Sequence, residues 1–210
     1  MESKHIINKK IRELKFVALD LEATYSKPLG RHEIIEIGAC KLKPGMLEIG
    51  NSYEMLVRPQ YPIIPAIKKK TGLTDEIVSR AKPITEIWNE FLAFIENRIL
   101  LVYKTIDIGI LQRTSKAYGL PSINNSFLDI FRLVKRVYPN EPSYALDHFR
   151  QFLKISKISH RAGADAYVTA LLFKHLIEIL KNKYKIFNYK ELLDYCYPNK
   201  ISNDNQRKLF

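Results

Sequence analysis

Residues 16–24 have the sequence Phe16-Val17-Ala18-Leu19-Asp20-Leu21-Glu22-Ala23-Thr24, an apolar, β-prone run that carries two acids. Side chains alternate between the two faces of a strand, so Asp20 and Glu22 should point the same way from its end. Two carboxylates held this close repel each other strongly where little solvent screens them. We therefore expect a positive partner between them, usually a metal ion.

A second stretch with chemical potential lies near the other end of the chain, at His160-Arg161-Ala162-Gly163-Ala164-Asp165. His160 precedes a predicted helix, and Asp165 falls in its first turns, among small residues that allow close approach to a sheet or substrate. Asp107 starts another predicted helix, directly after an apolar strand. Active sites of α/β folds gather at strand ends and helix starts. We expect these acids to meet in space.

The proposed cluster contains carboxylates and no thiolate, which suits Mg²⁺ or Mn²⁺ better than Zn²⁺. Two such ions about 3.5–4 Å apart can activate water and stabilise the leaving oxygen in phosphodiester cleavage. A histidine suits the base that takes the proton of the water, and His160 is the candidate. The residue types predict metal-assisted phosphodiester hydrolysis.

Charge and composition are compatible with this chemistry. The 210 residues include 34 Lys plus Arg against 22 Asp plus Glu, a net charge of +12. This favours a polyanionic partner, nucleic acid before an anionic membrane surface, although a Lys-, Ile- and Asn-rich composition alone can also produce it. The two cysteines, Cys40 and Cys196, are too few for a disulfide scaffold or a Cys-based zinc site. With no apolar run of about 20 residues and no signal-like start, we expect a cytoplasmic protein without membrane contact.

The order of predicted elements indicates an α/β or α+β domain with a mixed central sheet. We expect a basic N-terminal arm (1–14), a main domain (15–182) and a C-terminal extension (183–210). Three antiparallel strands come first, at Lys15–Leu21, Ile34–Leu42 and Leu47–Val57, and short strands at Ile99–Tyr103 and Phe127-Leu128 follow. The helices are expected at 64–70, 74–80, 84–95, 107–118, 129–137, 145–153, 161–181 and 187–195.

Three motifs resemble those of a known family: Phe16 to Thr24, then Ile106-Asp107-Ile108-Gly109-Ile110-Leu111, then His160 to Ala166. In this order they resemble the DEDDh 3′–5′ exonucleases, which include the proofreading epsilon subunit of bacterial replicative polymerase. Supporting similarities occur at Glu33–Ala39, Thr71–Thr74 and Ser143–Leu146, and the resemblance covers roughly residues 14–181.

The resemblance implies an RNase H-like fold and a role for each motif residue. Asp20, Glu22 and Asp165 would hold the ion that activates water, Asp20 would bridge to a second ion near Asp107, and His160 would be the general base. The backbone at Leu21, Ala23 and Thr24 would receive the 3′-terminal nucleotide. The products would be nucleoside 5′-monophosphates.

The chain departs from the family pattern at two places. Val102-Tyr103 stand where the family usually carries His-Asn before the second motif, unless the loop is two residues shorter, and Tyr25 replaces a common glycine. Tyr25 and Tyr103 are the candidates for stacking on bases.

Other prominent residues have structural explanations. Asp129 is expected to cap a helix, and Glu36 to lie in a strand and be hydrogen-bonded rather than catalytic. The run Lys68-Lys69-Lys70 either follows a phosphate backbone or forms a solvated helix face. The C-terminal Gln206-Arg207-Lys208-Leu209-Phe210 resembles peptides that bind a sliding clamp, with Gln206, Leu209 and Phe210 as the contacts.

The leading hypothesis is a metal-dependent 3′–5′ exonuclease acting on single-stranded DNA ends in proofreading or repair. The first alternative is the same chemistry on RNA ends. The second is a non-catalytic module that binds nucleic acid or a polymerase, which the acids Asp20, Glu22, Asp107 and Asp165 argue against.

Overall fold

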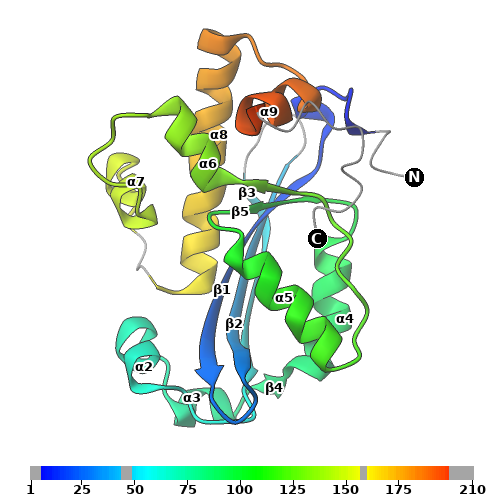
Figure 1. Cartoon of the computed structure of the whole chain (residues 1–210), viewed down its shortest axis with the longest axis vertical. Helices are drawn as coiled ribbons and strands as arrows, with labels where there is room; N and C mark the ends of the chain where they lie inside the picture. Colours follow the sequence, from blue (N-terminus) through cyan, green and yellow to red (C-terminus); the bar gives the residue numbers. More distant parts are fainter. Residues whose placement is uncertain (1–5, 44–48, 157–159, 199–210) are drawn as a thin grey trace.

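The computed structural model describes residues 6–43, 49–156 and 160–198, and a six-stranded mixed sheet lies at its centre (Figure 1). The strand order is β4-β3-β2-β1-β5-β6. The strands are β1 (Phe16–Ser26), β2 (Arg31–Leu42), β3 (Ile49–Arg58), β4 (Lys82–Pro83), β5 (Ile99–Val102) and β6 (Phe127–Asp129). The expected α/β fold with a mixed sheet is confirmed.

The first three strands form the expected antiparallel meander, and β5 and β6 add in parallel beyond β1. The prediction ended β1 too early. The strand runs on to Ser26, which pairs with Arg31 across a short turn that contains Gly30 at φ 62°. The two-residue strand β4 was missed, since it is too short to show any alternation of apolar and polar residues.

The helices lie close to their expected positions. They are α2 (Pro65–Thr71), α3 (Asp75–Ser79), α4 (Ile84–Ile95), α5 (Ile106–Ala117), α6 (Ile130–Val137), α7 (Leu146–Phe152), α8 (Ala162–Tyr184) and α9 (Tyr189–Cys196), with a 3-10 turn at Ile11–Glu13. The predicted caps are confirmed, because the Thr74 and Asp129 side chains accept hydrogen bonds from the N–H groups of Ile77 and Arg132. None of the helices in the described part of the chain has the length and apolar character needed to cross a membrane.

Helices cover both faces of the sheet. Helix α8 packs along β1 and β2, with α6, α7 and α9 on the same side, whereas α4 and α5 cover the other face (Figure 1). The alternation along β1 serves both layers: Phe16 and Ala18 belong to the core under α8, and Val17 and Leu19 to the core under α4 and α5. Asp20 and Glu22 follow the same alternation and lie on the face of β1 that α8 covers.

Both ends of the described chain join the core under α8. Ile11, Leu14 and Leu192 are buried in it. Backbone hydrogen bonds of 2.9 to 3.0 Å join residues 7–11 to 187–190. Apolar packing continues across the domain boundaries expected near residues 14 and 183. The division of the chain into an arm, a main domain and an extension therefore remains a prediction.

Candidate active site

The two acids of the first motif, Asp20 and Glu22, lie in the middle of β1. The sequence analysis places them at the end of this strand, which is wrong. The parallel pairing with β5 stops at Leu19 and Val102, immediately before Asp20. Beyond Val102 the chain turns into α5, whose first turn carries Asp107. The acids therefore follow the end of the parallel ladder, although β1 itself continues.

A close contact between β2 and α8 brings the third motif to the first. Gly38 lies opposite Asp20 in the β1–β2 ladder. A Cβ built on Gly38 would lie 2.0 to 2.2 Å from backbone atoms of Ala162 and Gly163. The absence of that Cβ lets the first turn of α8, which carries Asp165, approach the sheet.

Glu36 fixes the start of the same helix. Its buried carboxylate accepts hydrogen bonds from the Ala162 N–H at 2.9 Å and from the Arg161 guanidinium at 2.6 and 2.9 Å. A carboxylate is stabilised at a helix N-terminus by the N–H groups that have no partner within the helix. The structural role expected for Glu36 is confirmed.

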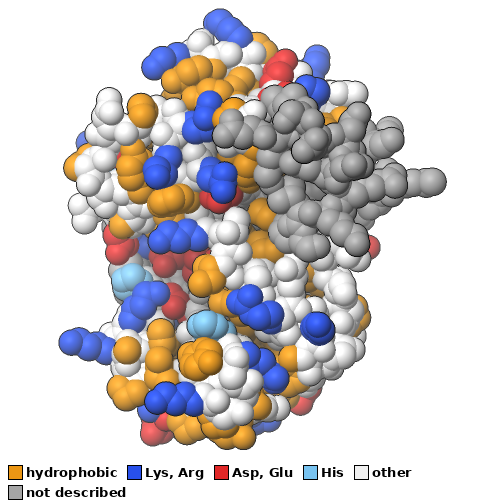
Figure 2. All heavy atoms as spheres, in the orientation of Figure 1, with side chains coloured by type: hydrophobic (Ala, Val, Ile, Leu, Met, Phe, Trp, Pro, Cys, Tyr) orange, Lys and Arg blue, Asp and Glu red, His pale blue; other side chains and the backbone are white. Residues whose placement is uncertain are grey.

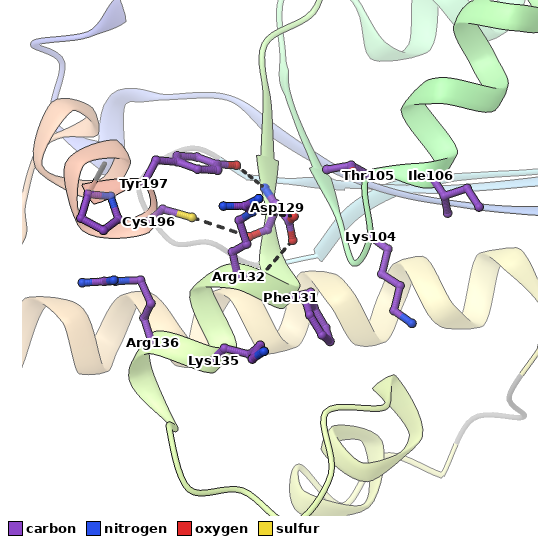
Figure 3. A pocket seen from close by; sticks show the side chains of 11 residues that line it. Lys104, Thr105, Ile106, Asp129, Phe131, Arg132, Lys135, Arg136, Cys196 and Tyr197 are labelled. Atoms are coloured by element: carbon purple, nitrogen blue, oxygen red, sulfur yellow. Dashed lines mark hydrogen bonds and ion pairs between the residues drawn. The ribbon is translucent and has the colours of Figure 1, made fainter. Parts of the chain in front are cut away.

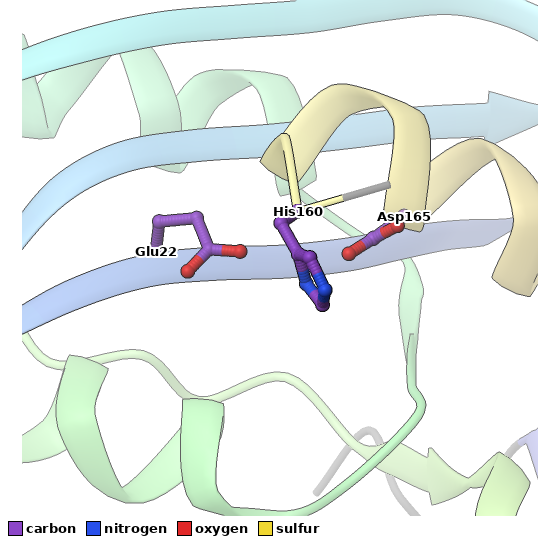
Figure 4. A group of neighbouring side chains, drawn as sticks. All are labelled: Glu22, His160 and Asp165. Carbon is purple, nitrogen blue, oxygen red and sulfur yellow. The ribbon is translucent and has the colours of Figure 1, made fainter. Parts of the chain in front are cut away.

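The residues of the three motifs line one cavity of about 310 Å³: Asp20, Glu22, Asp107, His160 and Asp165. Glu22, Asp165 and His160 come from β1, from α8 and from the residue two before that helix, and each offers a ligand atom within 4.8 Å of the other two (Figure 4). Figure 2 shows acidic side chains in a hollow of this face, with Lys, Arg and His side chains around it. His160 has φ 59°, a backbone region that few non-glycine residues adopt and that is common at functional sites.

Burial and mutual repulsion raise the pKa values of the clustered acids. Burial raises the pKa of Asp20 well above its ordinary value, and the charges of Asp107, Asp165 and Glu22 raise it further. Burial, then the charge of Glu22, raises the pKa of Asp107 to about 7. The pKa values of Glu22 and Asp165 are also raised, chiefly by burial. The cluster disfavours its own negative charge, so a cation would stabilise it.

Basic side chains partly offset this charge. Lys70 Nζ lies 3.4 Å from Glu22 Oε2, and the buried Arg150 pairs with Asp165. Arg150 also donates from Nε to Asp147 Oδ1 at 3.1 Å, and Asp147 Oδ2 lies 3.8 Å from His160 Nε2. Through these contacts α7 is linked to Asp165 and to His160, the two candidate catalytic residues of the third motif.

Arg150, Asp147 and Lys104 line or support the site and were missed by the sequence analysis. Asp147 and Arg150 are three residues apart on one face of α7, a spacing that predicts an ion pair within the helix. The spacing does not indicate that the two side chains also contact His160 and Asp165. Lys70 belongs to the run Lys68-Lys69-Lys70, for which a phosphate backbone and a solvated helix face are the two expectations, and it lines the cavity.

Only some of the residues expected to contact substrate line the cavity. Leu21 and Tyr103 line the cavity, whereas Ala23, Thr24 and Tyr25 lie farther along β1, outside its lining. The buried Thr24 hydroxyl accepts a hydrogen bond from the Ile64 N–H at 3.1 Å. Tyr103 is buried too, and its hydroxyl donates to the Tyr144 carbonyl at 2.7 Å. Tyr25 is 42% exposed. Gln206, Leu209 and Phe210 lie outside the described residues.

The donor set of the cavity fits hard divalent ions. Asp20, Glu22, Asp107 and Asp165 supply carboxylate oxygens, and no thiol is among the described residues that line the cavity. Burial raises the pKa values of these acids despite the nearby Lys70 and Arg150, so a bound cation would favour their charged forms.

The mixed sheet and the cavity lined by Asp20, Glu22, Asp107, His160 and Asp165 agree with the arrangement that the three DEDDh motifs imply for a 3′–5′ exonuclease domain. The exonuclease family RNase_T matches residues 17–173, and the chain belongs to this family, whose DEDDh members depend on divalent metal ions.

Several relatives are similar to the chain. The DNA polymerase III subunit epsilon of Aquifex aeolicus is 31% identical over 179 residues, which are 84% of this chain and 87% of that protein. The PolC-type DNA polymerase III of Caldanaerobacter subterraneus is 33% identical over 171 residues, 80% of this chain and 12% of the relative, so the chain spans a small part of that polymerase. The nuclease domain of 3'hExo, a DEDDh family member solved with bound rAMP, has the same fold, with a TM-score of 0.70 at 18% identity over 86% of this chain and 98% of that one.

Proposed function

We propose that this protein removes nucleotides from the 3′ end of DNA by phosphodiester hydrolysis and releases nucleoside 5′-monophosphates. The observation that carries the proposal is the convergence of Asp20, Glu22, Asp107, His160 and Asp165 on one cavity. A module that only binds nucleic acid has no need for four clustered acids whose pKa values are raised by burial.

We assign Mg²⁺ or Mn²⁺ as the ions, held by the carboxylates of Asp20, Glu22, Asp107 and Asp165. When bound, such ions activate water and neutralise charge on the leaving oxygen. The imidazole of His160 takes the proton of the attacking water, and the Asp147 carboxylate, 3.8 Å from its Nε2, helps to position the ring. The backbone at Leu21, a residue that lines the same cavity, is proposed to receive the 3′-terminal nucleotide.

Single-stranded DNA is the proposed substrate because the relatives with the higher identities are parts of DNA polymerase III. That similarity also supports a role in proofreading or repair, a polymerase as partner and a cytoplasmic location. RNA ends are the second candidate, because the 3'hExo domain with this fold was solved with bound rAMP.

The C-terminal residues 206–210 are proposed as a clamp-binding peptide, on the basis of their sequence Gln-Arg-Lys-Leu-Phe alone. Sliding-clamp binding that is unchanged after deletion of these five residues would remove this part of the proposal.

A degradation assay separates the three functional hypotheses. The full chain is incubated with a 3′-labelled single strand, as DNA and as RNA, with Mg²⁺ or Mn²⁺ and then with excess chelator. We expect release of labelled mononucleotide from DNA with either ion and none with chelator. Release from RNA alone would select the alternative substrate. Binding of both strands without cleavage under any condition would contradict the enzymatic proposal.

A further inference from the structure

A second cavity, of about 800 Å³, is larger than the catalytic cavity, and Figure 3 shows the side chains that line it. Lys104 and Ile106 line both this cavity and the catalytic cavity, so the two adjoin at the loop between β5 and α5. We call the larger cavity the α6–α9 groove. Its described lining consists of Lys104, Thr105, Ile106, Asp129, Phe131, Arg132, Lys135, Arg136, Cys196, Tyr197 and Pro198.

The groove is strongly basic. Arg132, Lys135 and Arg136 are exposed and share one face of α6 by their spacing of three and four, and Lys104 adds a fourth cation. Asp129 is the one carboxylate among the described lining residues, and it serves as the N-cap of α6. Its carboxylate accepts a hydrogen bond from the Arg132 N–H at 3.0 Å and lies 3.6 Å from Arg132 Nε. Most of the positive charge therefore faces solvent.

Aromatic rings alternate with these cations. Lys104 Nζ and Lys135 Nζ lie 5.6 and 5.5 Å from the centre of the Phe131 ring, and Arg132 Cζ lies 5.5 Å from that of Tyr197. The Tyr197 hydroxyl accepts a hydrogen bond from the Asp129 N–H at 3.1 Å, which fixes this wall (Figure 3). Cys196, Tyr197 and Pro198 follow residue 173, the last residue matched by the exonuclease family. The groove is thus completed by a segment outside the family match.

We propose that the α6–α9 groove binds the sugar–phosphate backbone of a single-stranded substrate on the 5′ side of the nucleotide being removed. The inference rests on the proposed exonuclease function, because a strand whose 3′ end lies in the catalytic cavity must leave that cavity along an adjoining surface. Cations for the phosphates and rings for the bases are the combination by which proteins hold single strands. The alternative occupant, an acidic segment of a protein partner, predicts a different outcome in the following experiment.

The binding experiment uses the full chain and a 5′-labelled oligothymidylate of about twelve nucleotides, a length within the range bound by single-strand sites. Excess chelator prevents cleavage, and fluorescence anisotropy gives the affinity from about 50 to 200 mM salt. The test variant is Lys135→Gln with Arg136→Gln, two exposed side chains of α6. The matched control is Arg80→Gln with Lys82→Gln, also exposed, which lie at and before β4, the opposite edge of the sheet from β6.

We expect the test variant to bind on the order of tenfold more weakly, and its salt slope to fall by about 1.4, since each phosphate contact to a single strand contributes about 0.7. The control should keep wild-type affinity and slope. A second variant, Lys135→Gln alone, should lower the slope by about 0.7 and covers the case in which the double variant does not fold. Wild-type affinity and slope in folded test variants would overturn the proposal and favour a protein occupant.

Hydrolysis of a dinucleotide by the wild-type protein is measured separately. A dinucleotide has a single phosphodiester bond, which the catalytic cavity must hold, so this assay tests the proposed function without the groove. Absence of dinucleotide and oligonucleotide cleavage would contradict the enzymatic proposal, whereas the anisotropy result reports on the groove in either case.

Discussion

Asp107 shows how burial shapes the chemistry of single residues in this protein. The residue is 6% exposed at the start of α5, and burial together with the charge of Glu22 raises the pKa of its carboxyl group to about 7. In the unfolded chain the same group would titrate at its ordinary, lower pKa. The folded, metal-free protein therefore holds a proton that the unfolded chain loses near pH 4, which couples stability to pH.

We predict that the free energy of unfolding of the metal-free protein falls as pH rises from about 4 to 7. A raised carboxyl pKa means that the unfolded state binds fewer protons than the folded state across that window, so stability declines there. The contribution of Asp107 is about 2–4 kcal/mol. Urea unfolding with chelator at several pH values measures it.

The Asp107→Asn variant should flatten part of this decline, because it removes the group with the raised pKa. Asp75→Asn is the control of opposite sign, since hydrogen bonds from Lys68 and Ile63 lower the pKa of Asp75 and its charge stabilises the fold. Identical pH profiles for wild type and Asp107→Asn would show that Asp107 is not protonated in the folded protein.

At His160 we predict that the His160→Ala variant slows cleavage by on the order of 10²–10⁴-fold, the contribution typical of a general base. Single-turnover rates with labelled DNA and Mn²⁺ measure the change. The control is His148→Ala, because His148 pairs with Glu141 at 2.7 Å and does not line the catalytic cavity. Comparable rates for the two variants would assign the proton transfer to another group.

At the scale of elements, the site depends on how closely α8 approaches β2. The backbone at Ala162 and Gly163 occupies the space that a side chain at residue 38 would need. Glu36 holds the helix start from the same strand, two residues away. A short segment of β2 thus sets the distance between Asp20 and Asp165.

We predict that Gly38→Ala destabilises the protein by about 1–3 kcal/mol or more, the usual cost of inserting a methyl group into a packed interior. The added Cβ would meet rigid backbone at 2.0 to 2.2 Å, so α8 must move away from β2. Cleavage should fall as well, because Asp165 moves with α8. Denaturant unfolding and the cleavage rate are the two readouts.

The matched control is Gly109→Ala in α5, where the new Cβ meets the flexible end of the Arg113 side chain at 3.1 Å. Replacing a glycine within a helix by alanine should be neutral or stabilising by up to about 1 kcal/mol. If Gly38→Ala behaves like Gly109→Ala, the close approach of α8 is not required.

At the scale of the whole molecule, the two ends of the described chain pack together against the sheet. Ile11 and Leu14 share an apolar cluster with Ile186, Tyr189 and Leu192. The same C-terminal segment supplies Tyr197 to the α6–α9 groove. The extension is therefore part of the folded core as well as of a proposed binding surface.

We predict that Leu192→Ala lowers the free energy of unfolding by about 2–5 kcal/mol, because Leu192 is fully buried and its truncation leaves a cavity. Unfolding should remain one transition if α9 and the sheet form one cooperative unit. The control Lys190→Ala removes only an exposed pair with Asp194 and should change stability by less than about 1 kcal/mol. A separate early transition in wild type would instead make residues 183–198 an independent unit.

Local sequence patterns determined a large part of this protein. The alternation in β1 places Asp20 and Glu22 on one face, the caps at Thr74 and Asp129 begin their helices, and the three motifs identify the family. These features depend on residues close in sequence, so periodicity and capping rules suffice to predict them. The end of β1 was predicted too early, because its extension to Ser26 depends on pairing with β2.

Tertiary structure alone decided how the site is completed. Arg150 pairs with Asp165, 15 positions away, and Lys70 contacts Glu22, 48 positions away. The groove brings Tyr197 to Asp129 at the start of α6, more than 60 positions away. No local pattern specifies such partners, because packing of the sheet and helices sets their distances. The raised pKa of Asp20 has the same origin: it requires burial and the charges of acids from α5 and α8, which only the folded chain brings together.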